Sequence, residues 1–286
     1  MSEPALPPWT DDLFPFPTPP PLARLVDLAW ENMLREGYYD YIMLECHYDF
    51  MFDLAAVPGP PAGWESTDLP RPDGGCDVPM FSVPEFVPFG SRGDGGWVGW
   101  AVPAPELGRT DHPVCIADGH QYGLTPCGDD TRAGLAYLLA RVRSADERLA
   151  RELGVTLDPI PDGPDDVDFE VPPGWRCEPG YDGIGVLAPA AAFAGQDPVV
   201  ALVDQDEPLE PALADAARWL DAGRPATALL GLKDTYVNTP LCLFAELKPL
   251  WARAYTDLGR PQYAARLDVM ARMYGALPCF CATPHT

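Results

Sequence analysis

Residues 83–100, which read VPEFVPFGSRGDGGWVGW, decide the fold of this chain. An apolar and aromatic run stops at a glycine-rich turn and resumes at Trp97. The alternation before the turn is typical of a half-buried strand, and Asp94-Gly95-Gly96 supplies residues that tolerate the positive φ angles of a tight reversal. The stretch therefore predicts two paired strands, at 83–89 and 97–101.

Two further strands are predicted at 114–117 and 121–125, joined by Asp118-Gly119-His120. Short strands separated by Gly and Asp turns indicate an antiparallel meander. We therefore expect an antiparallel sheet over residues 83–125 with one face on the core.

Helices are predicted on both sides of these strands. Residues 21–37 place apolar side chains at helical spacing, with a proline at the start and a glycine at the end. A second helix is predicted over about 131–153, with Asp129 and Asp130 as candidate N-terminal caps. Residues 38–54 are dense in aromatics and are compatible with a strand or a helix.

The C-terminal third contains an internal repeat. Ala222-Gly223-Arg224-Pro225 recurs as Leu258-Gly259-Arg260-Pro261 thirty-six positions later, and at the same offset Trp219 matches the aromatic Tyr255. A helix, a Gly-Arg-Pro turn and a second helix, occurring twice, indicate stacked helical hairpins with a period near the ~34 residues of tetratricopeptide repeats. We expect two such hairpins over about 209–275. They should lean on the rest of the protein, because arrays usually need three or more repeats.

These patterns predict an α+β fold, mainly an antiparallel sheet flanked by helices and followed by a C-terminal helical-hairpin segment. The predicted parts are a Pro-rich arm at 1–21, an α+β domain at 22–155, an acidic linker with short strands at 156–208, and the hairpins at 209–286. Residues 57–79 are expected to form a Pro/Gly-rich loop. Two or three short strands are expected within 171–203, and the sequence leaves open whether they join the first sheet.

The composition is strongly acidic. Of the 286 residues, 43 are acidic and 19 are basic, for a formal charge of −24, and the 36 prolines and 26 glycines indicate many short elements with long connections. Such a surface repels nucleic-acid phosphates and anionic lipid and attracts basic partners. Solubility alone is the alternative explanation for the charge.

No targeting or membrane-spanning segment is evident in the sequence. The first residues lack a basic segment followed by an apolar one, and no window reaches about 18 uncharged apolar residues. We expect a cytoplasmic protein without membrane association. In a reducing compartment its eight cysteines are expected to be thiols rather than disulfides.

One segment gathers acid, base and thiol within ten residues, namely Asp111-His112-Pro113-Val114-Cys115 with Asp118-Gly119-His120. These residue types could form the Cys–His nucleophile of a hydrolase. Strand alternation, however, sets Cys115 on one face with the histidines at the strand ends, so nothing in the sequence brings the thiol to either ring. Partly exposed loop histidines are the favoured interpretation, and the hydrolase stays an alternative.

Other candidate ligand groups are incomplete. Cys279-Phe280-Cys281 with His285 offers three ligands where structural zinc takes four, and Glu45-Cys46-His47 lies in an aromatic string that indicates a core thiol. The glycine-rich turn lacks the Gly-Lys-Ser/Thr ending of a phosphate loop and opens no helix. The acidic runs at 162–168 and 204–207 lack the ligand spacing of an EF-hand. The sequence therefore predicts no metal and no cofactor.

Several stretches between residues 81 and 140 carry a family resemblance. They read VPEFVPFG at 83–90, DGG at 94–96 and HPVCI at 112–116, and the region closes on GLAYLL at 134–139. In this order they resemble the SMI1/KNR4, or SUKH, superfamily, in which a strand ending in Pro-Phe-Gly leads through a glycine-rich turn to the central sheet. The insertion at 57–79 and the helical C-terminal extension depart from the family pattern.

The resemblance implies a non-catalytic α+β domain that binds proteins. Many bacterial members are immunity proteins that neutralise toxins, and others take part in regulatory assembly. The acidic charge points the same way, because an acidic inhibitor is attracted to a basic toxin. We therefore expect a protein partner such as a basic toxin and no nucleic acid, with a peptide-binding helical scaffold as a further alternative. The candidate binding residues are Asp94, Trp97, Trp100, Asp111, Asp118, Tyr236, Trp251 and Tyr255, the last three at an exposed surface.

Overall fold

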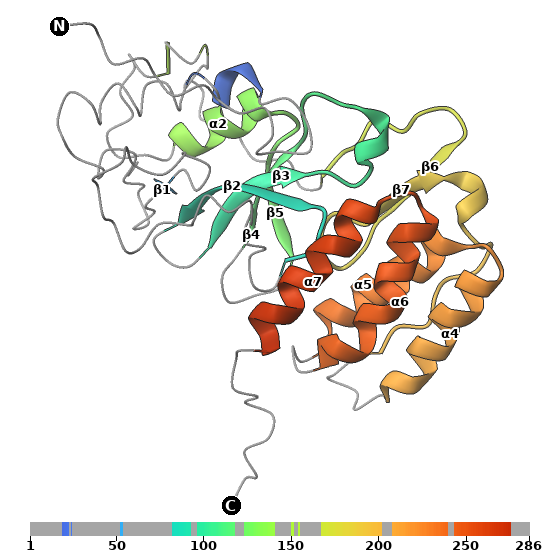
Figure 1. The fold of residues 1–286 in the computed structure, drawn as a ribbon. Coiled ribbons are helices and arrows are strands. Elements are labelled where there is room, and N and C mark those ends of the chain that lie inside the picture. The colour runs from blue at the N-terminus through green and yellow to red at the C-terminus, as the bar shows by residue number, and fades with distance from the viewer. Residues whose placement is uncertain are drawn as a thin grey trace, which may run out of the picture.

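An antiparallel sheet lies beside a layer of C-terminal helices in the computed structural model of the chain (Figure 1). The structure describes residues 19–22, 24, 52–53, 82–92, 96–117, 123–140, 150–151, 154, 167–201, 208–239 and 243–275. Within these ranges the predicted α+β class is confirmed, with the sheet preceding the helical segment along the chain.

The main sheet is an antiparallel meander whose strands are neighbours in sequence order, β1-β2-β3-β4-β5. The strands are β1 (Phe52–Asp53), β2 (Phe86–Arg92), β3 (Trp97–Ala101), β4 (Val114–Ala117) and β5 (Leu124–Gly128). The predicted pairing across the glycine-rich turn is confirmed, since Ser91 lies opposite Trp97 and Phe86 opposite Ala101. β5 begins three residues later than the predicted strand at 121–125.

The pairing of β2 with β3 depends on a glycine. A Cβ atom at Gly99 would lie 2.4 Å from the carbonyl oxygen of Val87 and 2.8 Å from the Phe86 ring, so no side chain fits there. The register also shifts between Pro88 and Gly90, which is the irregularity expected where proline interrupts a ladder.

Both faces of the sheet are covered, so the expectation of a half-buried strand at 83–89 is wrong. On one face α2 (Thr131–Leu139) packs so closely that a Cβ at Gly134 would lie 2.3 Å from Val114 Cβ. On the other face Phe86 and Cys115 belong to a hydrophobic cluster that continues into the C-terminal helices. Helices on both sides explain why even Phe86, Val87, Pro88 and Phe89, which are consecutive in β2, are all buried.

The predicted helix at 131–153 is shorter than expected. Asp130 caps α2 by accepting the backbone N–H of Ala133 at 2.7 Å, as the sequence indicated. The helix ends at Leu139, with Ala140 in a turn, and helical residues reappear only at 150–151 within the described chain. Apolar spacing continued past Leu139, but it did not specify a continuous helix.

Residues 167–201 form a second, two-stranded sheet, which answers the question left open by the sequence. Its strands are β6 (Trp175–Glu178) and β7 (Val186–Pro189), paired antiparallel and separate from the main sheet. A 3₁₀ turn, η3 (Ala190–Ala192), follows β7, and another, η2 (Pro105–Leu107), follows β3. The described part of the apolar run that begins at Pro198 is not a strand.

The C-terminal segment consists of two helical hairpins, as the repeat predicted. The first joins α4 (Leu209–Asp221) to α5 (Pro225–Val237), and the second joins α6 (Phe244–Asp257) to α7 (Pro261–Gly275). Successive helices pack against each other, and α4 also contacts α6. In Figure 1 the four helices are stacked together beside the sheet, with α4 farthest from it.

Both Gly-Arg-Pro turns close their first helix in the same way. Gly223 and Gly259 adopt left-handed backbone angles, with φ of 69° and 77°. The N–H of Arg224 donates to the Trp219 carbonyl at 2.8 Å, and that of Arg260 donates to the Tyr255 carbonyl at the same distance. This is the Schellman pattern, and the following proline begins the next helix.

Several expectations fall on residues that the structure does not describe. These are most of the N-terminal arm and of the helix at 21–37, the loop at 57–79, Asp94, Asp118, His120, the Glu45-Cys46-His47 group and the C-terminal Cys279, Cys281 and His285. Among the described residues, no helix combines the length and apolarity needed to cross a bilayer.

Candidate functional site

The aromatic residues proposed from the hairpins are not at the surface. Tyr236, Trp251 and Tyr255 are each at most 1% exposed, so the expectation of an exposed aromatic surface is wrong. Their rings pack in one cluster, with centroids 5.1 Å apart for Tyr236–Trp251 and 6.3 Å apart for Trp251–Tyr255. They fill the interior between the hairpins and cannot touch a partner in this fold.

The candidate binding residues on and near the sheet are also buried or hydrogen-bonded within the fold. Trp100 is fully buried, and its indole Nε1 donates to Thr131 Oγ1 at 2.8 Å. Asp111 Oδ1 accepts the backbone N–H groups of Thr131 at 3.1 Å and His112 at 2.8 Å, and also accepts the Thr131 hydroxyl. Trp97 is half-buried against the core. Trp100 and Asp111 thus attach α2 to the sheet, which is a structural explanation for both residues.

The described part of the acid–base–thiol segment, which includes His112 and Cys115, is buried in the protein interior. Cys115 is fully buried in the hydrophobic cluster, and burial, with Cys127 and Asp182 nearby, raises the pKa of its thiol well above the usual range. His112 is 4% exposed, so the expectation of a partly exposed loop histidine is wrong for this residue. Burial, with a further effect of Arg109, lowers the pKa of His112 to about 4, so its imidazole is neutral at pH 7. A nucleophilic thiol requires the opposite environment, electropositive and partly exposed.

A small crevice lies beside His112. It is lined by Pro103, Ala104, Leu107, Arg109, His112, Phe169 and Leu187 and has an empty volume of about 180 Å³. That volume includes space open to solvent, and its enclosed part has no room for even a water molecule. The crevice is therefore too small to enclose a metabolite-sized substrate.

The polar centre of the molecule surrounds Lys233, which the sequence analysis missed. Lys233 lies on α5 and is fully buried, as is Glu85 just before β2 and Asp182 in the β6–β7 turn. The ammonium Nζ lies 2.9 Å from Asp182 Oδ2 and 3.1 Å from Glu85 Oε1, and it donates to the Gly185 carbonyl at 2.5 Å. Three segments far apart in sequence therefore meet at one ammonium group.

The electrostatics of this cluster favour the ionised lysine. Burial alone would lower the pKa of Lys233, but the carboxylates of Asp182 and Glu85 raise it above its ordinary value. Asp234, the next residue on α5, has its pKa raised to about 6 by burial, although it accepts the Tyr181 N–H at 2.8 Å. The cluster thus places more buried carboxyl groups than ammonium groups in one region.

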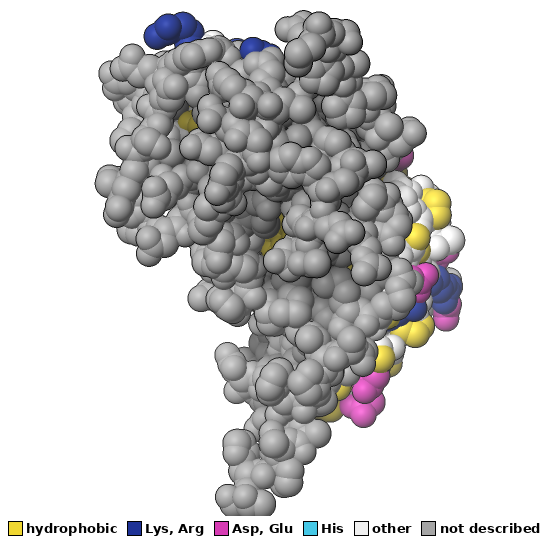
Figure 2. All heavy atoms as spheres, turned by 60° about the vertical axis from the view of Figure 1, so that its left-hand side comes forward, with side chains coloured by type: hydrophobic (Ala, Val, Ile, Leu, Met, Phe, Trp, Pro, Cys, Tyr) yellow, Lys and Arg dark blue, Asp and Glu magenta, His cyan; other side chains and the backbone are white. Residues whose placement is uncertain are grey.

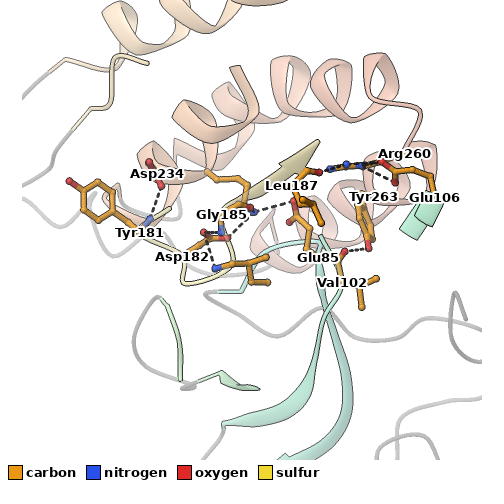
Figure 3. Close-up of polar contacts among 12 residues, drawn as sticks. Glu85, Val102, Glu106, Tyr181, Asp182, Gly185, Leu187, Asp234, Arg260 and Tyr263 are labelled. Carbon is orange, nitrogen blue, oxygen red and sulfur yellow. Dashed lines mark hydrogen bonds and ion pairs between the residues drawn. The ribbon is translucent and has the colours of Figure 1, made fainter. Parts of the chain in front are cut away.

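A second buried cation, Arg260, lies nearby and joins the helices to the loop after β3. Its guanidinium makes bonds of 2.7–3.1 Å to both carboxylate oxygens of Glu106 and also donates to the Leu187 carbonyl. Figure 3 shows Arg260 and Glu106 on one side of Glu85 and Asp182, with Tyr263 pointing to the Val102 carbonyl. The Gly185 and Leu187 carbonyls, two residues apart at β7, therefore accept from Lys233 and Arg260.

The sequence feature that could have revealed Lys233 is a pair of adjacent charges, Lys233-Asp234, inside an otherwise apolar helix. Twelve of the 13 residues of α5 are buried, and a helix that is apolar almost all round is expected to be buried. Lys233 and Asp234 are adjacent charges within that apolar helix, so burial with partners should have been expected. Glu85 lies inside the motif at 83–90, where the pattern predicts only a strand.

Exposed acidic side chains occur on both α4 and α6, which contact each other. The α4–α6 acidic face consists of Glu210, Asp221, Glu246 and Asp257, all exposed. Arg253 pairs with both Asp221, at 2.9 Å, and Asp257, at 3.5 Å. Within the described residues, Glu210 and Glu246 make no ion pair, which leaves two free carboxylates on this face.

Charged side chains of both signs are visible where the described surface emerges at the right-hand edge of Figure 2. The described part of the surface in that view is therefore not uniformly acidic. Local groups of carboxylates that outnumber their cations, such as those on α4 and α6, are the places where an attractive potential for a basic partner can concentrate.

Comparison with known proteins gives no assignment, since no family model and no curated protein matches the chain. Among the described residues there is also no group of three or more His, Cys, Asp or Glu side chains arranged to hold a metal ion.

Proposed function

We propose that this chain is a non-catalytic, acidic protein-binding module whose residues 22–155 form a SUKH-like domain. Its partner on this proposal is a basic protein, for example a toxin that it neutralises in the cytoplasm. The observation that carries the proposal is the α4–α6 acidic face, where Glu210 and Glu246 are exposed without an ion pair in the described chain. Exposed charges of this kind steer a partner of opposite sign.

The repeat adds support to this choice of surface. Glu210 and Glu246 occupy equivalent positions, thirty-six residues apart, near the start of α4 and α6, and Asp221 and Asp257 are equivalent at their ends. The two first helices therefore present similar acidic side chains in similar places. Two adjacent helices with matching carboxylates suit a broad basic surface better than a single point charge.

The domain proposal is supported by the arrangement of the motif residues. The stretch at 83–90 leads into β2, HPVCI at 112–116 leads into β4, and GLAYLL at 134–139 lies on α2, which packs on the same sheet. This order of strand, turn, strand and closing helix is what the resemblance implies for a SUKH domain.

Calorimetric titration against the basic proteins encoded by the genes that flank this one tests the proposed function. We expect binding that weakens steeply between low and high salt, since exposed charges are screened by ions. Replacing both free carboxylates (Glu210→Gln and Glu246→Gln together) should weaken binding about fivefold, from a modest contribution by each charge. Both residues lie in the first turn of a helix, where a carboxylate also stabilises the helix, so thermal unfolding of the variant is measured alongside.

The matched control removes the same amount of charge from another surface, at the exposed Asp129 and Glu170. The double variant Asp129→Asn and Glu170→Gln should keep nearly wild-type affinity. Binding that ignores salt, equal losses in both double variants, or no binding to any flanking basic protein would contradict the proposal.

A further inference from the structure

The Lys233 cluster has the geometry of a reactive site as well as that of an ion pair. A lysine amine, an aspartate carboxyl and a glutamate carboxyl meet at 2.9 and 3.1 Å in a region where all three side chains are at most 2% exposed. We propose that Lys233 and Asp182 join spontaneously as an intramolecular isopeptide bond, with Glu85 as the proton-transfer group. This inference is independent of the proposed partner.

The choice of lysine at this position is the first argument. Lys233 and Lys248 are the two lysines of the chain, which otherwise uses arginine for its permanent positive charges. Arginine is the better residue for a buried ion pair, because its planar guanidinium binds a carboxylate through two bonds, as Arg260 does with Glu106. A primary amine differs in being able to act as a nucleophile toward a carboxyl carbon.

The two carboxyl groups are held in different ways, which assigns their roles. Asp182 Oδ1 accepts the backbone N–H groups of Gly185 at 2.9 Å and Ile184 at 3.3 Å, while its Oδ2 faces Lys233. Two N–H donors on Oδ1 can stabilise negative charge that develops there during attack on Cγ. Glu85 receives no backbone N–H groups of this kind: its Oε1 lies 3.1 Å from Lys233 Nζ, within reach of a proton from the ammonium, and its other hydrogen-bond partner is the buried Tyr255 hydroxyl.

The step balances without any co-reactant. The ionised lysine is the resting form, so Glu85 Oε1 accepts a proton from the Lys233 ammonium only transiently. The freed amine then forms a bond from Nζ to Asp182 Cγ. The bond from Cγ to Oδ2 then breaks, and Oδ2 leaves as water with two of the three ammonium protons, one of them carried by Glu85. The third proton stays on the amide nitrogen.

The surroundings favour condensation over hydrolysis. The reacting groups are held by three packed segments, so the attack is intramolecular and the entropy of bringing the groups together is lost during folding. The neighbouring side chains of Trp251, Tyr255 and Phe86 are fully buried and exclude bulk water from the cluster. The product would tie the β6–β7 turn covalently to α5.

Intact mass spectrometry of the denatured full-length protein tests this inference. We expect the wild-type chain to be lighter than its sequence mass by one water, and a protease digest to contain a cross-linked peptide joining residues 182 and 233. Lys233→Arg keeps the cation but should restore the full sequence mass. The control Lys248→Arg changes the half-exposed lysine that pairs with Asp268 at 2.6 Å, and it should retain the water loss.

Asp182→Asn sharpens the assignment of the acyl donor. If residue 182 supplies the acyl group, the asparagine variant should lose ammonia in place of water. Asp182-Gly183 can also lose water by closing to a succinimide, but that loss would persist in Lys233→Arg and would give no cross-linked peptide. A wild-type chain at its full sequence mass, or a water loss that survives Lys233→Arg, overturns the proposal whether or not the variants fold well.

Discussion

The two Gly-Arg-Pro turns have the same backbone and opposite surroundings. In the first hairpin Arg224 is exposed and donates to the Ala191 carbonyl, whereas in the second hairpin Arg260 is fully buried against Glu106. Both follow a glycine with φ of 69° or 77° and precede a proline that begins a helix. Local sequence therefore determines the turn, and the neighbours in the fold determine what its arginine does.

The hairpins also differ in the polar groups that they bury. The first hairpin supplies hydrogen-bond partners to residues 193–201, which have no regular structure of their own. Thr227 accepts the N–H of Ala194 at 2.7 Å, and Asp215 accepts that of Val199 at 2.9 Å. Arg260 is the buried charged residue of the second hairpin within the described chain. The first hairpin thus satisfies backbone N–H groups of an irregular segment, as a neighbouring strand would do in a sheet.

The largest difference in stability is expected between alanine variants of the two arginines, Arg224 and Arg260. Arg260→Ala should lower the free energy of unfolding by about 3 kcal/mol, at the low end for a broken buried ion pair because Glu106 stays partly exposed. Arg224→Ala should cost less than about 1 kcal/mol, because its contacts are at the surface. Urea unfolding of both variants measures the difference. Equal losses would contradict the assignment of different roles to the two turns.

The buried acids of the first hairpin should give it a distinctive pH dependence. Burial raises the pKa of Asp234 from 3.8 to about 6, so the folded state binds a proton that the unfolded state releases between those pH values. The stability linked to this proton is therefore present at pH 4 and is lost as the pH rises through 6. Asp234→Asn should remove this dependence and raise stability at pH 7 by about 2 kcal/mol.

Asp215 is the internal control for that experiment. Burial alone would raise its pKa, but the Val199 N–H, Arg218 and the Trp219 indole together lower it. Its contribution is present above pH 4 and is lost as the pH falls through the lowered pKa, so the sign is opposite to that of Asp234. At pH 7, urea unfolding should find Asp215→Asn less stable than wild type and Asp234→Asn more stable. Stability changes of the same sign in Asp215→Asn and Asp234→Asn would contradict the opposite pKa shifts of the two acids.

The smallest difference in stability is expected between alanine variants of the two turn glycines, Gly223 and Gly259. A Cβ atom at Gly223 or Gly259 meets nothing within 4 Å, so an alanine at either position suffers only from the left-handed backbone. Gly223→Ala and Gly259→Ala should each lower stability by about 1 kcal/mol, and by similar amounts. Thermal unfolding of the two variants checks this. A much larger loss at one glycine would show that the turns are not equivalent.

The sequence predicted features that depend on local pattern. The hairpin of β2 and β3, the cap at Asp130 and the repeat of helix, turn and helix follow from residue types and spacing. It did not predict which surfaces pack together. The strand at 83–89 was expected to be half-buried, and Tyr236 and Trp251 were expected at the surface, because no local pattern shows that other segments cover them.

The candidate site was harder to predict for the same reason. Glu85, Asp182 and Lys233 lie in three segments separated by up to 148 residues, so their meeting depends on tertiary packing. Only the charged pair Lys233-Asp234 inside an apolar helix gave a local indication. The exposed Glu210 and Glu246 were within reach of sequence reasoning through the repeat, but they were not singled out there.

Hydrogen–deuterium exchange of the full chain, with and without a flanking-gene basic protein, tests the proposed binding surface most directly. The account predicts slower exchange on binding in peptides from α4 and α6, around Glu210 and Glu246, and little change in peptides from 96–117 and 129–140. Protection confined to the main sheet, with α4 and α6 unchanged, would contradict the claim that this chain acts through its acidic helical face.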